Sequence, residues 1–141
     1  MLIFVLVKLL KKEKAENWGA HMFVSIHANA SGINHNYLGA DGTSMYYHNP
    51  LWKGFAEKIY LRMLELPLNE FGLVGSFNYK PIRMSERPSM LVEQAFMSNA
   101  EDEEKLASDE FRKKMAEKVF LGICDYLEWF YKKPVKSIKK K

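Results

Sequence analysis

The amino-acid sequence predicts a layered α/β fold in a single domain, and three observations support this. Short apolar runs alternate with longer segments whose apolar residues recur at helical spacing. The chain has 141 residues, enough for one hydrophobic core, and no linker divides it. With 48% hydrophobic and 27% charged residues, its composition is that of a globular domain. We expect the domain to span residues 1–131 and a basic, flexible tail to span 132–141.

The first half of the chain predicts two or three strands. Residues 2–7 are rich in Ile, Phe and Val and favour a strand, which merges into a lysine-rich helical pattern up to about residue 17. Gly19 is typical of a helix C-terminus. A buried strand is predicted over 22–27, followed by a loop rich in Ser, Gly, Asn and Asp and by a second strand over 43–47.

The second half predicts two helices and two further strands. Residues 51–66 have helical periodicity, and Pro67 ends them. Residues 72–79 are expected to be a loop or an irregular strand, 80–84 a short strand and 89–93 a buried one. The last helix is predicted from Ser108, its N-cap, to about Tyr131. Cys124, the single cysteine, falls in this helix and is expected in the core.

Two chemically useful side chains stand at the ends of predicted strands. His27 closes the run 22–27, and Glu93 closes the run 89–93. Sites in open α/β sheets gather at the carboxyl ends of strands, so we expect both side chains at one rim. Imidazole is a standard zinc ligand, and a carboxylate beside it can accept the proton of an activated water. Taken singly, each residue also has a structural interpretation, as a hydrogen-bonded histidine and a solvated glutamate.

The segments around these two residues resemble zinc-dependent N-acetylmuramoyl-L-alanine amidases. Residues 17–29, NWGAHMFVSIHAN, are similar to GADLFVSIHAN of that family, and residues 88–99, PSMLVEQAFMSN, to PAVLVELGFLSN. Residues 101–106 continue in the manner of PEDEKLL, residues 42–47 resemble GVETYY, and residues 81–83 resemble VLR. The resemblance covers roughly residues 9–130, with the motifs in the same order, which makes it specific.

The resemblance implies a mixed sheet flanked by helices on both faces. It also implies hydrolysis of the amide between N-acetylmuramic acid and L-alanine in peptidoglycan, with zinc as cofactor. His27 matches the last zinc ligand, and Glu93 matches the glutamate that works with the zinc-bound water. Asn29 and Arg83 match positions beside the site and are carried over as substrate-binding candidates. The implied location is the periplasm or cell wall, although residues 1–10 lack the features of a secretory signal.

Two zinc ligands of the family have no counterpart in this sequence. One is the histidine of a DPGHGG type segment after the first strand, and the other is a glutamate on the following helix. The sequence therefore predicts an amidase domain truncated at its N-terminus. His21 lies six residues before His27, about 20 Å along a strand, which is too far to share a metal. His35 and His48 are interpreted as surface histidines rather than replacement ligands.

Two functional hypotheses follow. One is a peptidoglycan amidase, and the other is a catalytically incomplete fragment that binds the cell wall or regulates such an enzyme. The ordered motifs disfavour an unrelated α/β domain. A missing strand would leave an open sheet edge, which predicts self-association unless residues 2–7 cover it.

The net charge of +4 owes much to the lysines after residue 131. We interpret this tail as solvated, with attraction to an anionic polymer or surface as the alternative. No nucleic-acid recognition module accompanies it, and no apolar run of the sequence is long enough to span a bilayer.

Overall fold

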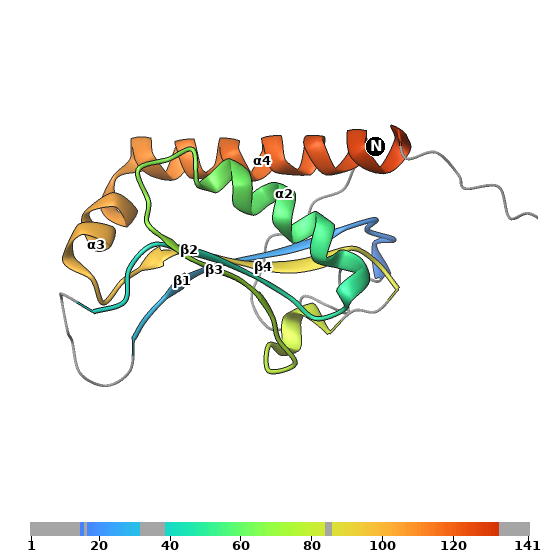
Figure 1. Ribbon diagram of the computed structural model, residues 1–141, viewed down its shortest axis with the longest axis horizontal. Helices are drawn as coiled ribbons and strands as arrows, with labels where there is room; N and C mark the ends of the chain where they lie inside the picture. The colour runs from blue at the N-terminus through green and yellow to red at the C-terminus, as the bar shows by residue number, and fades with distance from the viewer. Residues whose placement is uncertain (1–14, 16, 32–38, 84–85, 133–141) are drawn as a thin grey trace, which may run out of the picture.

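The computed structural model describes residues 15, 17–31, 39–83 and 86–132 (Figure 1). The strand predicted over 2–7, most of the helix predicted after it, His35 and the tail after Lys132 lie outside the described residues.

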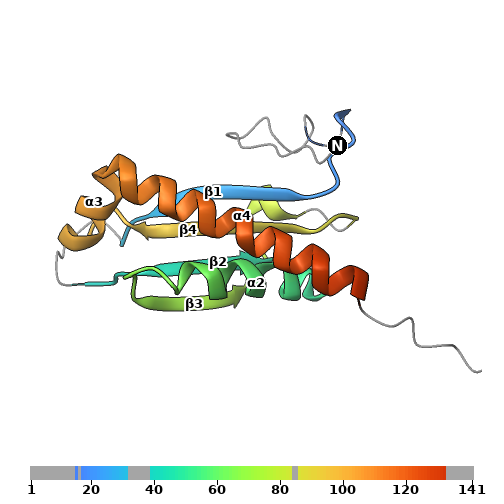
Figure 2. The same ribbon diagram turned by 90° about the horizontal axis from the view of Figure 1, so that it is seen from above.

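Four strands form one mixed sheet, as predicted. They are β1 (Phe23–Asn29), β2 (Thr43–Tyr47), β3 (Glu70–Gly75) and β4 (Ser89–Phe96). Their order across the sheet is β1-β4-β2-β3, which Figure 2 shows from above. β1 runs parallel to β4, and β2 runs parallel to β3, while β2 and β4 are antiparallel. The carboxyl ends of β1 and β4 therefore lie at the same end of the sheet as the amino ends of β2 and β3.

Two helices cover one face of this sheet (Figure 1). They are α2 (Lys53–Met63), preceded by the 3-10 turn η1 (Pro50–Trp52), and α4 (Asp109–Lys132). The main core lies between helices and sheet and contains, among others, Val24, Met45, Phe55, Ile59, Met63, Met90, Val92, Met115 and Ile123. Because side chains alternate along a strand, the strand residues next to Val24, Met45, Met90 and Val92 point to the opposite face of the sheet.

Residues from two helical segments contact that opposite face. Phe23 packs with Ala15, which is helical, and with Ala20. Ile82, in the 3-10 turn η2 (Lys80–Ile82), packs with Tyr46 and Leu91. Helical residues therefore lie on both faces, although α2 and α4 share one.

The two long helices approach each other closely at Gly122. A Cβ atom at this position would lie 2.5 Å from the Cα of Ile59, so only glycine fits there. Beside this contact the guanidinium of Arg62 donates two hydrogen bonds to Asp125, at 2.7 and 3.1 Å. The close contact and the ion pair together fix α4 over α2.

Three sequence-based expectations differ from the structure. The short strand predicted over 80–84 is wrong, because residues 80–82 form η2, where Pro81 has no N–H to donate to a strand ladder. The helix α3 (Ala100–Ala107) was not predicted, because its run of acidic residues lacks an apolar stripe. The expectation that Cys124 lies in the core is also wrong: it is exposed, one position beyond the buried stripe of α4.

Candidate functional site

His27 and Glu93 lie side by side toward the carboxyl ends of β1 and β4, but β1 continues to Asn29 and β4 to Phe96, so the strands do not end at these residues as predicted. The two residues are register partners in the parallel ladder, so their backbones are about 4.8 Å apart. Val92 points into the core under α2 and α4, and Glu93, the next residue, points to the opposite face. His27 faces the same way as Glu93. The structure thus brings together the two residues that the sequence singled out.

Glu93 is a buried carboxyl group with an unusual environment. Only 5% of its surface is exposed, and its Oε2 atom has no hydrogen-bond partner among the described residues. Burial disfavours the charged form and raises the pKa of Glu93 to about 7. A carboxyl group with this pKa exchanges a proton readily near neutral pH, which suits a general acid or base.

His27 is the exposed partner of the pair. Its Nε2 atom lies 2.8 Å from the hydroxyl oxygen of Ser25, two residues earlier on the same face of β1. Ser25 is itself buried and holds the imidazole ring in position. The ring is therefore accessible from solvent but has a fixed orientation.

Two further side chains complete the surroundings of Glu93. Ser44, at the start of β2, is its register partner in the antiparallel ladder, and the buried hydroxyl of Ser44 has no hydrogen-bond partner among the described residues. Tyr79 lies next to Tyr46, with ring centroids 4.6 Å apart. Burial, then Tyr46, then the charge of Glu93 raise the pKa of Tyr79 to about 12, so this phenol stays protonated. Sequence reasoning missed both residues, because only the tertiary fold brings them near Glu93: Ser44 by strand pairing, and Tyr79 from the position before η2.

The segments after β1 and β4 are tied to each other just beyond this pair. The backbone N–H of Met97 donates to the carbonyl of Asn29 at 2.8 Å. The backbone N–H of Ser31 donates to the hydroxyl of Ser98 at 2.9 Å, and the two hydroxyls lie 3.0 Å apart. These hydrogen bonds hold the segment after β1 against the segment after β4.

Asp102 ties the same rim to β2 and α3. Its side chain is 98% buried, and its Oδ2 atom accepts the backbone N–H of Gly42 at 2.7 Å and of Phe96 at 3.0 Å. Lys105 donates to its other oxygen at 3.3 Å. Gly42 has φ of 88°, and a Cβ there would lie 2.1 Å from a backbone oxygen, so the turn requires glycine. The sequence held one indication of this role of Asp102. Asn99 caps α3, and Asp102 follows three residues later in the first turn, a spacing typical of a helix N-terminus.

The two substrate-binding candidates are placed differently from the central pair. The side-chain oxygen of Asn29 accepts the backbone N–H of Ala30 at 2.8 Å, so this side chain folds back on its own loop. Arg83 follows η2 and donates to the carbonyl of Phe77 at 2.8 and 2.5 Å. Asn29 stands two residues beyond His27 at the rim, whereas the observed bonds of Arg83 hold the segment after β3.

The metal-binding capacity of the described residues is limited. A catalytic zinc takes three protein ligands, and no group of three His, Cys, Asp or Glu residues suited to a metal occurs in the described part of the chain. His21 and His48 lie at the opposite end of the sheet, because β2 runs antiparallel to β4. His27 therefore fits a single ligand position next to Glu93, and the described residues do not complete a zinc centre.

Comparisons with known proteins agree on one family. The profile of the N-acetylmuramoyl-L-alanine amidase family matches residues 9–125. An uncharacterised cell wall amidase of Bacillus anthracis is 36% identical over 132 residues, which cover 87% of this chain and 23% of that protein. The N-acetylmuramoyl-L-alanine amidase LytC of Bacillus subtilis is 32% identical over 118 residues, covering 80% of this chain and 23% of LytC. The chain thus spans about a quarter of the length of these two relatives.

Solved amidase structures share the fold. The N-acetylmuramoyl-L-alanine amidase AmiC2 of Nostoc punctiforme matches with a TM-score of 0.76 and 33% identity, over 86% of this chain and 67% of that one. The catalytic domain of the amidase CwlV from Paenibacillus polymyxa matches with a TM-score of 0.70 and 32% identity, over 82% of this chain and 63% of that one.

Proposed function

Because this chain belongs to the N-acetylmuramoyl-L-alanine amidase family, we propose that it is part of a peptidoglycan hydrolase. The bond cleaved is the amide between the lactyl group of N-acetylmuramic acid and L-alanine. The observation that carries this proposal is the buried carboxyl of Glu93, with a pKa of about 7, beside the exposed imidazole of His27. In this proposal the protein acts in the periplasm or cell wall, where its substrate is found.

Glu93 is the proton carrier in the proposed reaction. Its carboxylate accepts a proton from the attacking water, and the resulting carboxylic acid donates a proton to the leaving nitrogen of L-alanine. A pKa close to 7 suits both steps, because neither form is strongly favoured at neutral pH. No described residue makes a hydrogen bond to the Oε2 atom of Glu93. This atom is therefore available to contact the water and the leaving nitrogen. Tyr79 stays protonated and provides a hydrogen-bond donor near the carboxyl.

His27 is the proposed protein ligand to zinc. An imidazole held by Ser25 and open to solvent suits this role. Zinc bound in such a site supplies Lewis-acid polarisation of a water and of the scissile carbonyl. The other ligands of a complete centre would have to come from outside the described residues. Asn29 and Arg83 remain substrate-binding candidates, with Asn29 nearer to the pair.

The test measures zinc content and amide cleavage by the purified chain. Stoichiometric zinc and release of stem peptides with a free L-alanine amino group from muropeptides would support the proposal. His27→Ala should then lower zinc affinity measured by calorimetry, while the matched variant His48→Ala should not. Unchanged zinc affinity in His27→Ala would contradict the ligand assignment.

The alternative function is a catalytically incomplete fragment that binds the cell wall or regulates an amidase. Among the described residues only His27 is assigned as a metal ligand and no group of three ligands occurs, which favours this alternative. Retention on purified peptidoglycan without zinc and without cleavage would support it. Stoichiometric zinc together with cleavage that is lost in Glu93→Gln would exclude it.

Self-association through a sheet edge is also part of the proposal. β1 forms one edge of the described sheet, yet its first three residues are buried on both faces, as is typical of a central strand. Light scattering after size-exclusion chromatography tests this point. A concentration-dependent dimer would support it, and a monomer at all concentrations would contradict it.

A further inference from the structure

One row of residues crosses all four described strands at the level of Glu93. His27 on β1 and Ser44 on β2 are the register partners of Glu93. Gly72 on β3 is in turn the register partner of Ser44. Register partners on neighbouring strands point to the same face, so the whole row faces away from α2 and α4. We call these four residues the cross-sheet row.

Two neighbouring hydroxyl groups at the start of β2 differ in what they bind. Thr43 donates its hydroxyl hydrogen to the backbone carbonyl of Glu93 at 3.1 Å, which ties β2 to β4. Ser44, the next residue, is completely buried, and its hydroxyl has no partner in the described part of the chain. The same holds for the Oε2 atom of Glu93. Two such atoms on adjacent strands are explained if a bound group completes their hydrogen bonds.

The cross-sheet row is least covered on the side of β3. Gly72 has no side chain, and a Cβ atom there would have one near neighbour among the described residues, the γ-methyl carbon of Val74 at 3.6 Å. Val74 is itself 37% exposed. Rotation about the single χ1 bond of Ser44 moves its hydroxyl between staggered positions. Contact with a group that lies over Gly72 and Glu93 therefore requires no backbone change.

A carboxylate and a hydroxyl side by side match one residue of an extended peptide. In an extended chain the N–H and C=O groups of a residue point to the same side, as they do in the hydrogen-bonded pairs of an antiparallel ladder. Glu93 accepts a hydrogen bond from such an N–H group, and Ser44 donates one to the C=O group. In the proposed reaction the N–H group at Glu93 is that of L-alanine. The carbonyl group next to Ser44 then belongs to the same residue.

We propose that Ser44 binds the stem peptide, with its hydroxyl donating a hydrogen bond to the carbonyl oxygen of the L-alanine whose nitrogen lies at Glu93. This inference rests on the proposed function, which supplies the position of that nitrogen. The contact makes the site selective for ligands that continue beyond the nitrogen as a peptide. A site with a buried hydrogen-bonding group rejects an analogue that lacks the matching group, because the buried group then stays unpaired.

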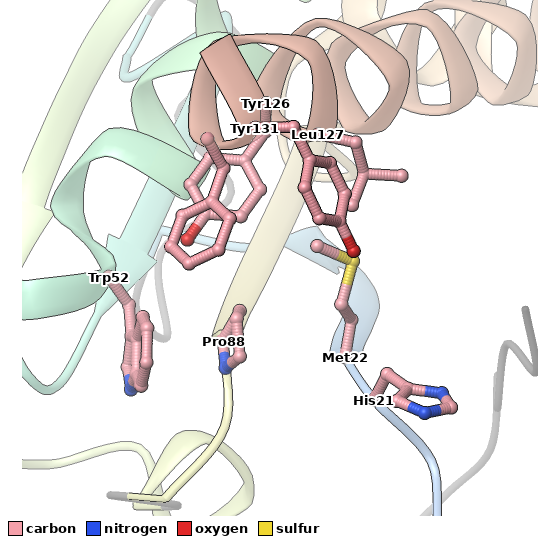
Figure 3. Close-up of a pocket in the computed structure, with 8 residues that line it drawn as sticks. His21, Met22, Trp52, Pro88, Tyr126, Leu127 and Tyr131 are labelled. Atoms are coloured by element: carbon pink, nitrogen blue, oxygen red, sulfur yellow. The ribbon is translucent and has the colours of Figure 1, made fainter. Parts of the chain in front are cut away.

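A separate cavity of about 390 Å³ lies at the other end of the sheet (Figure 3). It is lined by His21 and Pro88, which precede β1 and β4, whereas Glu93 lies toward the carboxyl end of its strand. α4 lines it too, and neither α4 nor another described helix is long and apolar enough to cross a membrane. Residues of this cavity take no part in the contact with Ser44 and provide control positions.

Two small probes test the proposal on the whole, metal-free chain. One is N-acetylmuramoyl-L-alaninamide, and the other is N-acetylmuramoyl-isopropylamide, in which a methyl group replaces the carboxamide and its carbonyl. NMR titration measures the dissociation constant of each probe. We expect the wild type to bind the alaninamide about tenfold more tightly than the isopropylamide, because a hydrogen bond to a buried group contributes about that factor.

The variant Ser44→Ala assigns this preference to the hydroxyl. It should weaken binding of the alaninamide about tenfold and leave binding of the isopropylamide unchanged. Its melting temperature should not fall, which shows that the variant folds. Tyr60→Phe removes a buried hydroxyl from the helix-covered face, and His21→Ala changes the separate cavity. Both control variants should keep the preference of the wild type.

Three outcomes would overturn the proposal. They are no binding of either probe, equal affinity of the wild type for both probes, and an equal loss for both probes in Ser44→Ala. Cleavage of muropeptides, assayed separately, distinguishes this failure from that of the proposed function. Cleavage without the preference would leave the amidase proposal standing and remove the role of Ser44. The preference without cleavage would keep the role of Ser44 in binding and count against the proposed activity.

Discussion

The two faces of the sheet differ in how their buried groups are satisfied. On the face under α2 and α4, the strands contribute apolar side chains such as Met45, Met90 and Val92, which pack against the helices. On the opposite face, neighbouring strands place the hydroxyl of Ser44 and the carboxyl of Glu93 in buried positions with atoms that lack partners among the described residues. Buried polar groups without partners destabilise a fold. We propose that the first face mainly stabilises the domain and that the buried polar groups of the second, at Ser44 and Glu93, belong to a ligand site.

The largest expected effect is on activity. If the domain is assayed with a complete metal centre, Glu93→Gln should lower amide cleavage about 10²- to 10⁴-fold, because it removes the proton carrier. The control is Glu57→Gln, an exposed glutamate on α2, which should leave the rate unchanged. Equal rates for wild type and Glu93→Gln would show that Glu93 is not the general base.

The next effect concerns the helix-covered face. Met45 is fully buried in the main core, so Met45→Ala should lower the free energy of unfolding by about 2–5 kcal/mol. Chemical denaturation measures this change. A loss well under 1 kcal/mol would mean that the core does not pack around β2 as described.

The pH dependence of stability tests the opposite face. The pKa of Glu93 is raised from 4.5 to about 7 in the folded, metal-free chain. The native state therefore holds a proton that the unfolded state releases above pH 4.5. This contribution to stability is fully present below about pH 4.5 and is lost as the pH rises through about 7, a change of about 3 kcal/mol.

The variant Glu93→Gln isolates this contribution from those of the other carboxylates. We compare the free energy of unfolding of Glu93→Gln with that of the wild type. The difference, variant minus wild type, should be about 3 kcal/mol larger at pH 8 than at pH 4.5. Denaturation curves at both pH values measure the difference. If the difference in free energy of unfolding between wild type and Glu93→Gln is the same at pH 4.5 and pH 8, the pKa of Glu93 is not raised.

The smallest effect is expected at Ser44, next to Met45 on β2. Ser44→Ala removes a buried hydroxyl without a partner among the described residues, so stability should stay equal or rise by about 1 kcal/mol. The contrast with Met45→Ala compares the two faces at adjacent positions. A loss of more than about 1 kcal/mol would show that the hydroxyl makes a stabilising contact.

The sequence predicted the strands that carry His27 and Glu93 but not the surroundings of these two residues. β1 and β2 appear where apolar runs placed them, and those runs also put His27 and Glu93 toward the same end of the sheet, although β4 continues beyond Glu93 to Phe96. The burial of Glu93 was not predictable, since it depends on pairing with Ser44, 49 residues away, and on Tyr79. The role of Asp102 was missed for the same reason: its partner Gly42 directly precedes β2, and its partner Phe96 is the last residue of β4.

The most direct test of this account is an NMR titration of the Glu93 side-chain carboxyl carbon in the metal-free chain, with Glu93→Gln used to assign the signal. The account predicts a pKa of about 7. A value close to 4.5, the ordinary value for a glutamate, would contradict it. In that case the carboxyl would be solvated, and the face opposite α2 and α4 would lose its distinguishing feature.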